Sequence, residues 1–158
     1  MNSTSTFPTV LRELLRTNQA FLAYAATHVS TLDLTLPQYD IIITLGDTPG
    51  MTFKKLGEKT LITKGTLTGV ISRLEDKGLV QRVASETDGR SQIVRLTAEG
   101  EALYRRTFPE HLVFINRIFT DYSPEDIAAI ESSLRRLHET VTTLRSNGSG
   151  ELADEFDQ

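Results

Sequence analysis

The stretch Thr52–Leu96, which reads TFKKLGEKTLITKGTLTGVISRLEDKGLVQRVASETDGRSQIVRL, decides the fold of this chain. It divides into a short helix, a turn, a longer helix and two strands. Thr52 is placed to cap the first helix, and after a break at residues 60–61 Thr63 is placed to cap the second, which should end near residues 77–78. This is helix-turn-helix spacing.

The longer helix has two different faces. Apolar residues recur at i, i+3, i+4 and i+7, which predicts one buried face. The opposite face is small, hydroxylated and basic, so we expect it to be exposed. The apolar set is Leu67, Val70, Ile71 and Leu74, and the opposite set is Lys64, Gly65, Thr68, Gly69, Ser72 and Arg73.

Two runs of partly alternating, β-branched character, residues 79–83 and 91–96, follow this helix directly. Asp88-Gly89 in their connection is a hairpin signal. A hairpin placed straight after such a helix is a wing, and its tip carries Arg90. The narrow minor groove of DNA attracts such an arginine because its negative potential is enhanced.

The order of these residues strongly resembles the MarR (multiple antibiotic resistance regulator) family of winged-helix repressors. The specific motifs are R-L-E-x-K-G-L-V at residues 73–80, D-x-R at 88–90 and R-L-T-x-x-G at 95–100, and the likeness extends over roughly residues 7–145. The chain departs from the pattern at Gly65 and Gly69, where many members carry serine and arginine. The resemblance implies a dimeric regulator of transcription, most often a repressor. Its DNA affinity would fall when a small molecule or an oxidant reaches the hinge between the dimerisation helices and the DNA-binding region.

The composition of the chain limits the classes of protein to which it can belong. The 158 residues suffice for one domain of ordinary size, and the absence of cysteine excludes disulfides and thiol-based redox sensing. Net charge is −4, yet residues 51–95 carry nine Lys or Arg against five Asp or Glu, which leaves −8 on the remainder. One basic module on an acidic body favours phosphate contact through one face. With no signal sequence and no run of about eighteen apolar residues, we expect a cytoplasmic protein.

Helices should flank this stretch on both sides. We expect one over residues 8–30, a second over 39–45 opened by the capping box at Thr35–Gln38, and a third after Thr97 that Pro109 kinks or briefly interrupts. The apolar face of the third would comprise Leu103, Leu112, Ile115, Ile118 and Phe119.

A last helix should begin at Ser123-Pro124 and carry a heptad seam. Residues 146–150 should stop it, leaving a disordered acidic tail. The seam could cover only its own chain, as in a bundle, but dimerisation also gives the first helix a place to bury its apolar stripe. The dimer interface would comprise Leu11, Leu14, Ile127, Leu134, Leu137, Val141 and Leu144.

We therefore predict a mainly α fold with a small β-wing: a winged helix-turn-helix with N- and C-terminal dimerisation helices. The expected parts are residues 1–34 (dimerisation helix), 35–97 (DNA-binding region), 98–146 (dimerisation helices) and 147–158 (tail). No nucleophile with a paired base, phosphate loop or carboxylate pair in a pocket is apparent, so we expect neither catalysis nor a cofactor. The three histidines, His28, His111 and His138, share no metal-ligand spacing.

The predicted function is binding of double-stranded DNA by a homodimer at a palindromic operator. Lys64, Thr66 and Thr68 would meet bases or phosphates, Arg73 the backbone, and Arg90, oriented by Asp88, the minor groove. The full predicted set is Lys54, Thr63, Lys64, Gly65, Thr66, Thr68, Gly69, Ser72, Arg73, Asp88, Gly89 and Arg90.

The sequence also leads to expectations about two glycines, an effector site and an alternative function. Gly65 and Gly69 each cost a helix about 1 kcal/mol relative to alanine, which close approach of the backbone to DNA would explain. From the resemblance alone, an aromatic or amphipathic effector would lodge near Tyr24, His28 or His111. The alternative function is a winged helix that docks another protein without reading DNA, and its binding would not weaken steeply with salt.

Overall fold

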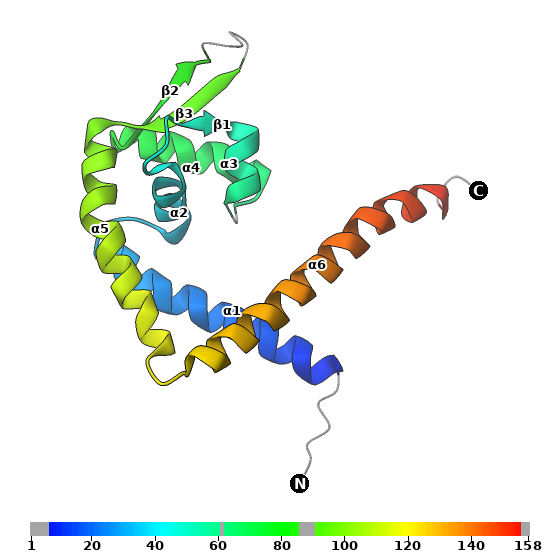
Figure 1. Ribbon diagram of the computed structural model, residues 1–158. Coiled ribbons are helices and arrows are strands. Elements are labelled where there is room, and N and C mark those ends of the chain that lie inside the picture. Colours follow the sequence, from blue (N-terminus) through cyan, green and yellow to red (C-terminus); the bar gives the residue numbers. More distant parts are fainter. Residues whose placement is uncertain (1–6, 61, 86–90, 156–158) are drawn as a thin grey trace. The chain divides into compact units, whose positions relative to one another are not determined.

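The computed structural model describes residues 7–60, 62–85 and 91–155, with side chains described up to residue 147. Its elements in chain order are α1 (Phe7–Ser30), α2 (Leu36–Leu45), β1 (Met51–Thr52), α3 (Phe53–Lys59), α4 (Lys64–Asp76), β2 (Val80–Ala84), β3 (Gln92–Leu96), α5 (Ala98–Asn116), η1 (Arg117–Phe119) and α6 (Pro124–Glu155). The fold is mainly helical with a small antiparallel sheet, as predicted (Figure 1). No helix in the described ranges is long and apolar enough to span a membrane.

The chain forms two compact units, Met1–Ile115 and Asn116–Gln158. In the first unit, α2, α3 and α4 gather beside the sheet, and the hairpin of β2 and β3 extends away from them (Figure 1). The second unit contains η1 and the long helix α6.

Local chemistry fixes the beginnings of α2 and α3. Thr35 and Gln38 form the predicted capping box: the Gln38 amide donates to Thr35 Oγ1 at 3.4 Å, and the Thr35 amide donates to Gln38 Oε1 at 2.9 Å. Thr52 caps α3 by accepting from the Lys55 amide at 3.3 Å. Each side chain satisfies an amide that lacks a partner in the first turn.

The end of α4 lies at the predicted place. Gly78 follows it with φ +70°, a left-handed conformation that glycine adopts without strain. The Leu79 amide donates back to the Leu74 carbonyl at 3.0 Å, and the Gly78 amide to that of Glu75 at 2.8 Å. This C-terminal motif turns the chain out of α4 directly into β2.

The sheet has three strands in the order β1-β3-β2. The hairpin was predicted, but β1 was not, because two residues carry no alternating pattern. Met51 pairs with Val94 and Thr52 with Ile93. Gly50 makes this approach possible, since its φ is +101° and a Cβ there would lie 2.6 Å from the Val94 carbonyl oxygen.

The core of the first unit lies between α2, α4 and the sheet. Ile41, Ile42 and Leu45 on α2 are fully buried, as are Ile71 and Leu74 on α4. The other predicted apolar residues of α4, Leu67 and Val70, are 2% and 4% exposed. Burial of this face leaves the opposite face of α4 outward, which is what positions the candidate site.

The prediction for α5 was partly wrong. Thr97 caps it, since the Gly100 amide donates to Thr97 Oγ1 at 3.1 Å, but the helix continues through Pro109 without a break. Leu112 is 45% exposed, and the buried residues are Gly100, Tyr104, Thr107 and His111. Polar groups can line this buried face because they find partners: Tyr39 Oη donates to Thr107 Oγ1 at 3.1 Å.

Helix α6 begins as predicted and ends later. The Asp126 amide donates to Ser123 Oγ at 3.1 Å, which caps its first turn. The predicted stop at residues 146–150 is wrong, because the helix runs to Glu155. The last residues of the predicted tail, 156–158, lie outside the described residues. Glycine costs a helix only about 1 kcal/mol, and the residues after Gly150 include good helix formers.

Candidate nucleic-acid interface

The outward face of α4 carries the predicted small and basic residues. Arg73 and the exposed residues of the first turns surround a surface without a large apolar side chain. Because the other face forms the core, this set cannot turn inward without unpacking the unit. Its exposed members are Lys64, Gly65, Thr66, Thr68, Gly69 and Arg73.

Gly65 and Gly69 are not required by the packing of the chain. Among the described residues, a Cβ built on either glycine meets no atom within 4 Å outside its chain neighbours and the nearby backbone of α4 itself, and neither residue has a positive φ. Alanine would therefore fit at both positions and would favour the helix by about 1 kcal/mol each. Because the two glycines have no side chains, the backbone of α4 is exposed between them on the outward face.

The predicted cap at Thr63 is in the right position but acts differently. Thr63 is the residue before the first turn of α4, yet its side chain caps no backbone amide. Its hydroxyl donates instead to Thr66 Oγ1 at 3.0 Å, because that neighbouring acceptor lies one turn ahead. Two of the predicted DNA-contacting hydroxyls are thus joined to each other at the exposed start of the helix.

Arg82 on β2 joins α4 to the hairpin. Its Nη2 donates to Ser72 Oγ at 2.8 Å, its main-chain amide donates to Glu75 Oε1 at 3.2 Å, and its Nε lies 3.1 Å from Glu75 Oε2. The guanidinium also lies over the Phe53 ring, 5.4 Å from the centroid. Ser72, predicted to face DNA, is half-buried with its hydroxyl occupied, so its observed contact is with the wing.

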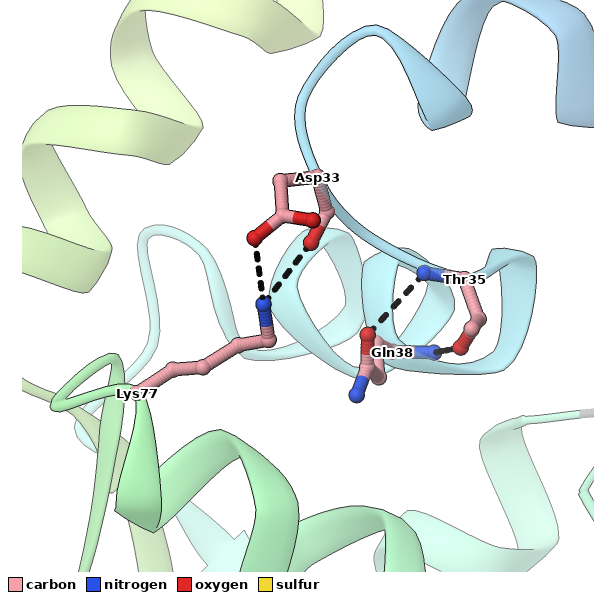
Figure 2. Close-up of polar contacts among 4 residues, drawn as sticks. All are labelled: Asp33, Thr35, Gln38 and Lys77. Atoms are coloured by element: carbon pink, nitrogen blue, oxygen red, sulfur yellow. Dashed lines mark hydrogen bonds and ion pairs between the residues drawn. The ribbon is translucent and has the colours of Figure 1, made fainter.

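Lys77 joins the end of α4 to the turn after α1. Figure 2 shows its ammonium reaching Asp33, beside the capping box of Thr35 and Gln38 that opens α2. Sequence reasoning missed this contact because 44 residues separate the partners. Through Arg82 and Lys77, α4 thus contacts both the wing and the turn after α1.

Of the remaining residues predicted to contact DNA, one lies on α3 and three lie in the connection between β2 and β3. Lys54 is exposed on α3, together with Lys55 and Lys59, so this helix adds positive charge near the α4 face. Asp88, Gly89 and Arg90 lie outside the described residues. The described strands on either side of them pair from Val80 with Leu96 to Ala84 with Gln92.

The three predicted effector residues lie close together. His28 on α1 and His111 on α5 place their Nδ1 atoms 3.1 Å apart, although 83 residues separate them in sequence. Tyr24 stacks on Phe114 with ring centroids 4.4 Å apart, and its hydroxyl donates to the Phe114 carbonyl at 3.0 Å. His28 also stacks on Phe114, at 5.2 Å. Sequence spacing gives no sign of the histidine pair.

A cavity of about 660 Å³ adjoins this cluster. His111 belongs to its lining, whereas Tyr24 and His28 do not. Burial, and secondarily the charge of His28, lower the pKa of His111. No group of three metal-ligating residues occurs within the described part of the chain. The lining comprises Asn18, Phe21, Leu22, Ala25, Leu36, Pro37, Tyr39, Asp40, Ile43, Ile62 and His111.

The helix pair α3 and α4 with the hairpin after it defines a winged helix-turn-helix protein. Comparison with known proteins gives its family. Residues 34–92 match the model of the MarR family. The organic hydroperoxide resistance transcriptional regulator of Bacillus subtilis is 32% identical over 138 residues, which cover 80% of this chain and 91% of that protein. The chain belongs to the MarR family of DNA-binding transcriptional regulators.

Two further comparisons agree with this assignment. The homoprotocatechuate degradative operon repressor of Escherichia coli is 37% identical over 93 residues, 59% of this chain and 63% of that repressor. The crystal structure of AbsC, a MarR family transcriptional regulator from Streptomyces coelicolor, superposes with a TM-score of 0.79 at 27% identity, over 89% of this chain and 97% of AbsC. The family and the fold predicted from the sequence are confirmed.

Proposed function

We propose that this chain is a sequence-specific regulator that binds duplex DNA as a homodimer, represses transcription and responds to a small molecule. The observation that carries the proposal is the outward face of α4. This face is basic and has two glycines without side chains, while the opposite face of the helix is buried in the core. An exposed helix of this kind fits the major groove. The relatives named above are regulators rather than enzymes, which supports a role without catalysis.

Each part of the face would make a different contact. Lys64, Thr66 and Thr68, in the N-terminal half of α4, would reach base edges and nearby phosphates. The N-terminal end of a helix also carries partial positive charge, which favours phosphate there. Arg73, further along, would bind the DNA backbone, and Lys54 on α3 would add a phosphate contact. Asp88, Gly89 and Arg90 would extend the contact into the minor groove.

The homodimer is supported by apolar side chains that neither unit buries. On α1, Leu11 is 41% exposed and Leu14 is half-buried. On α6, the seam residues Leu134 and Val141 are 50% and 56% exposed. A second copy of the chain offers the matching surface, because a two-fold axis brings identical seams together.

The symmetry of the dimer would be repeated in the DNA. Two recognition helices related by a two-fold axis bind half-sites about one helical turn, roughly 34 Å, apart. The operator would therefore be an imperfect palindrome. The response to a small molecule is supported by the cavity between α1, α2 and α5, which has the size of many ligand sites.

Footprinting with the full chain on the promoter beside its own gene tests the proposal. We expect protection of a palindromic site and an affinity that falls steeply as salt rises, because binding releases counterions from phosphates. A protein-docking module, the alternative function, would protect no site. Its interface with a protein partner would also depend weakly on salt.

A further inference from the structure

We propose that Arg82 is a positioning residue for DNA binding, which holds the hairpin of β2 and β3 at a fixed place beside α4 so that both meet the duplex together. On this account Ser72 acts on DNA binding through Arg82 and not by a contact of its own with DNA. The inference rests on the proposed function in one respect, namely that α4 and the hairpin bind the same duplex.

Arg82 lies on the face of the hairpin that is turned toward the core. Side chains alternate between the two faces of a strand, so Val80 and Arg82 share a face. Val80 is buried, and so is Val94, the cross-strand neighbour of Arg82. A charged side chain at the edge of a core is costly unless it finds partners there. The contacts of Arg82 therefore decide whether the hairpin can lie against α4.

The partners of Arg82 come from two helices. Its Nη2 donates to Ser72 Oγ at 2.8 Å, and its main-chain amide donates to Glu75 Oε1 at 3.2 Å. Ser72 and Glu75 are three residues apart, which places them on one side of α4. The Phe53 ring of α3 lies under the guanidinium. One residue of β2 thus contacts both helices of the helix-turn-helix.

The same contacts make Arg82 a poor ligand for a phosphate. Its Nε is buried and makes no hydrogen bond among the described residues, although Glu75 Oε2 lies 3.1 Å away. Its Nη2 is occupied by Ser72, and the Glu75 carboxylate compensates its charge. The rigid fork of a guanidinium is suited to spanning two partners in this way. Arg82 therefore joins neighbouring elements and leaves the attraction of DNA to other cations.

Ser72 stands at the border of the outward face of α4. It follows Gly69 by three residues on the helix, and its neighbour Arg73 is exposed. A hairpin that is fixed to Ser72 is therefore fixed to the surface that we propose meets the major groove. Two elements held in the binding geometry lose less freedom on binding than two elements that move separately.

Arg82→Lys separates the geometry from the charge. Lysine keeps a positive charge beside Glu75, but its single ammonium cannot reproduce the fork that spans Ser72 and Glu75. In titrations of a labelled promoter duplex we expect Arg82→Lys to bind weaker by on the order of tenfold. Its salt dependence should be flatter although its net charge is unchanged, because the hairpin loses phosphate contacts. Full affinity in Arg82→Lys would reduce Arg82 to a source of positive charge and overturn the inference.

Ser72→Ala is the second variant, because it breaks the same contact without touching any charge. Alanine favours a helix over serine, so this variant should melt no lower than the wild type. We expect it to bind the duplex about threefold to tenfold more weakly. The double variant Arg82→Lys/Ser72→Ala should bind no more weakly than Arg82→Lys alone, since both changes remove one contact. Additive losses would show that Ser72 touches DNA itself, which contradicts the inference.

Arg105→Lys is the matched control. It makes the same exchange in another arginine–glutamate pair, with Glu101 on α5, where Nε and Oε2 lie 3.8 Å apart. This variant should bind the duplex with the affinity and the salt dependence of the wild type. An equal loss in Arg105→Lys would show that any such exchange weakens binding, and the positioning role of Arg82 would fall.

The mobility of the hairpin can be measured without DNA. The chain has no cysteine, so Gln92→Cys, at an exposed position of β3, carries a single fluorescent label. Time-resolved anisotropy of this label should show more fast local motion in Arg82→Lys and in Ser72→Ala than in the wild type or Arg105→Lys. Identical decays in all four proteins would overturn the inference.

The two measurements separate this inference from the proposed function. If the wild type binds the promoter and Arg82→Lys binds it equally tightly, the inference fails and the proposed function stands. If the wild type does not bind the promoter, the proposed function fails, and the anisotropy still decides whether Arg82 holds the hairpin.

Discussion

The Lys77 ammonium donates two hydrogen bonds to Asp33, one to its main-chain carbonyl and one to its carboxylate Oδ2, each 2.9 Å long (Figure 2). Lys77 is the C-cap residue of α4, and Asp33 lies in the turn after α1 with φ +55°. An exposed ion pair adds little to stability. We expect the pair instead to orient α4 relative to α1, the helix that we propose enters the dimer interface.

Replacing Lys77 should be visible at Asp33. The hydrogen bond from Lys77, and secondly its charge, lower the pKa of the Asp33 carboxyl below its ordinary 3.8. In Lys77→Met this pKa, followed by NMR, should return toward 3.8. Because the folded pKa is the lower one, the stabilisation is present above 3.8 and is lost as pH falls through the folded value.

The same variant should affect DNA binding more than folding. We expect a nearly unchanged melting temperature for Lys77→Met and weaker binding to the promoter duplex, because α4 is less firmly oriented. Arg16→Met, which removes another exposed pair, with Glu13 within α1, is the matched control. Equal effects of the two variants on DNA affinity would count against a positioning role for Lys77.

The proposed dimer should depend on the α6 seam. Leu137→Glu places a charge in the apolar row and should yield monomers with weak promoter affinity, measured by sedimentation and by duplex titration. Ser132→Glu, exposed on the same helix outside the seam, should leave the dimer intact. A wild-type monomer at micromolar concentration with full promoter affinity would refute the dimer.

His111 should make stability depend on pH. Its pKa lies below the ordinary 6.5 because the ring is buried and, secondarily, because His28 is near. The unfolded chain therefore binds a proton first as pH falls below 6.5, and the free energy of unfolding decreases until the folded pKa is passed. Thermal melts between about pH 8 and pH 5 should show a smaller decrease for His111→Phe than for the wild type or His138→Phe. Three parallel curves would contradict this.

The wing prediction concerns Arg90, which lies outside the described residues. Arg90→Ala should leave the melting temperature almost unchanged, weaken promoter binding by about 1–3 kcal/mol per subunit, and flatten the salt dependence. Asp88→Ala should cost less, because it removes only the group that orients the arginine. Arg106→Ala, an exposed arginine on α5, is the control. Unchanged affinity and salt slope in Arg90→Ala would make the wing a structural hairpin and favour the protein-docking alternative.

The features that could be predicted from the sequence are those that depend on residues close together in the chain. The buried face of α4, from Leu67 to Leu74, follows from a helical period of apolar residues, and the turn at Gly78 follows from a glycine placed just after it. Thr52 and Thr63 show the limit of prediction from neighbouring residues. Both lie at helix starts, but only Thr52 caps its helix, because Thr66 offers Thr63 another hydroxyl.

Contacts between distant segments could not be predicted. The Lys77–Asp33 and His28–His111 pairs join residues 44 and 83 positions apart, and no sequence period marks either pair. The strand at Met51 is too short to show alternation, and it exists because β3 offers it an edge. The apolar face predicted for α5 did not include Tyr104, Thr107 and His111, because only their tertiary partners make the burial of these polar residues possible.

The double variant Gly65→Ala/Gly69→Ala tests most directly whether the outward face of α4 lies against DNA. Both methyl groups enter open space in the free protein, so the double variant should be more stable by up to about 1 kcal/mol for each substitution. Against DNA the same methyl groups would hold the backbone away. Gly57→Ala on α3, whose added methyl would meet only the Leu67 side chain at 3.4 Å, is the control.

The measurement is titration of the full chain into a labelled promoter duplex, with a thermal melt of each variant. We expect the double variant to melt at a higher temperature than the wild type and to bind the duplex weaker by on the order of tenfold or more, with Gly57→Ala binding as the wild type does. A double variant that melts higher and binds the duplex as tightly as the wild type would show that this face of α4 does not contact DNA.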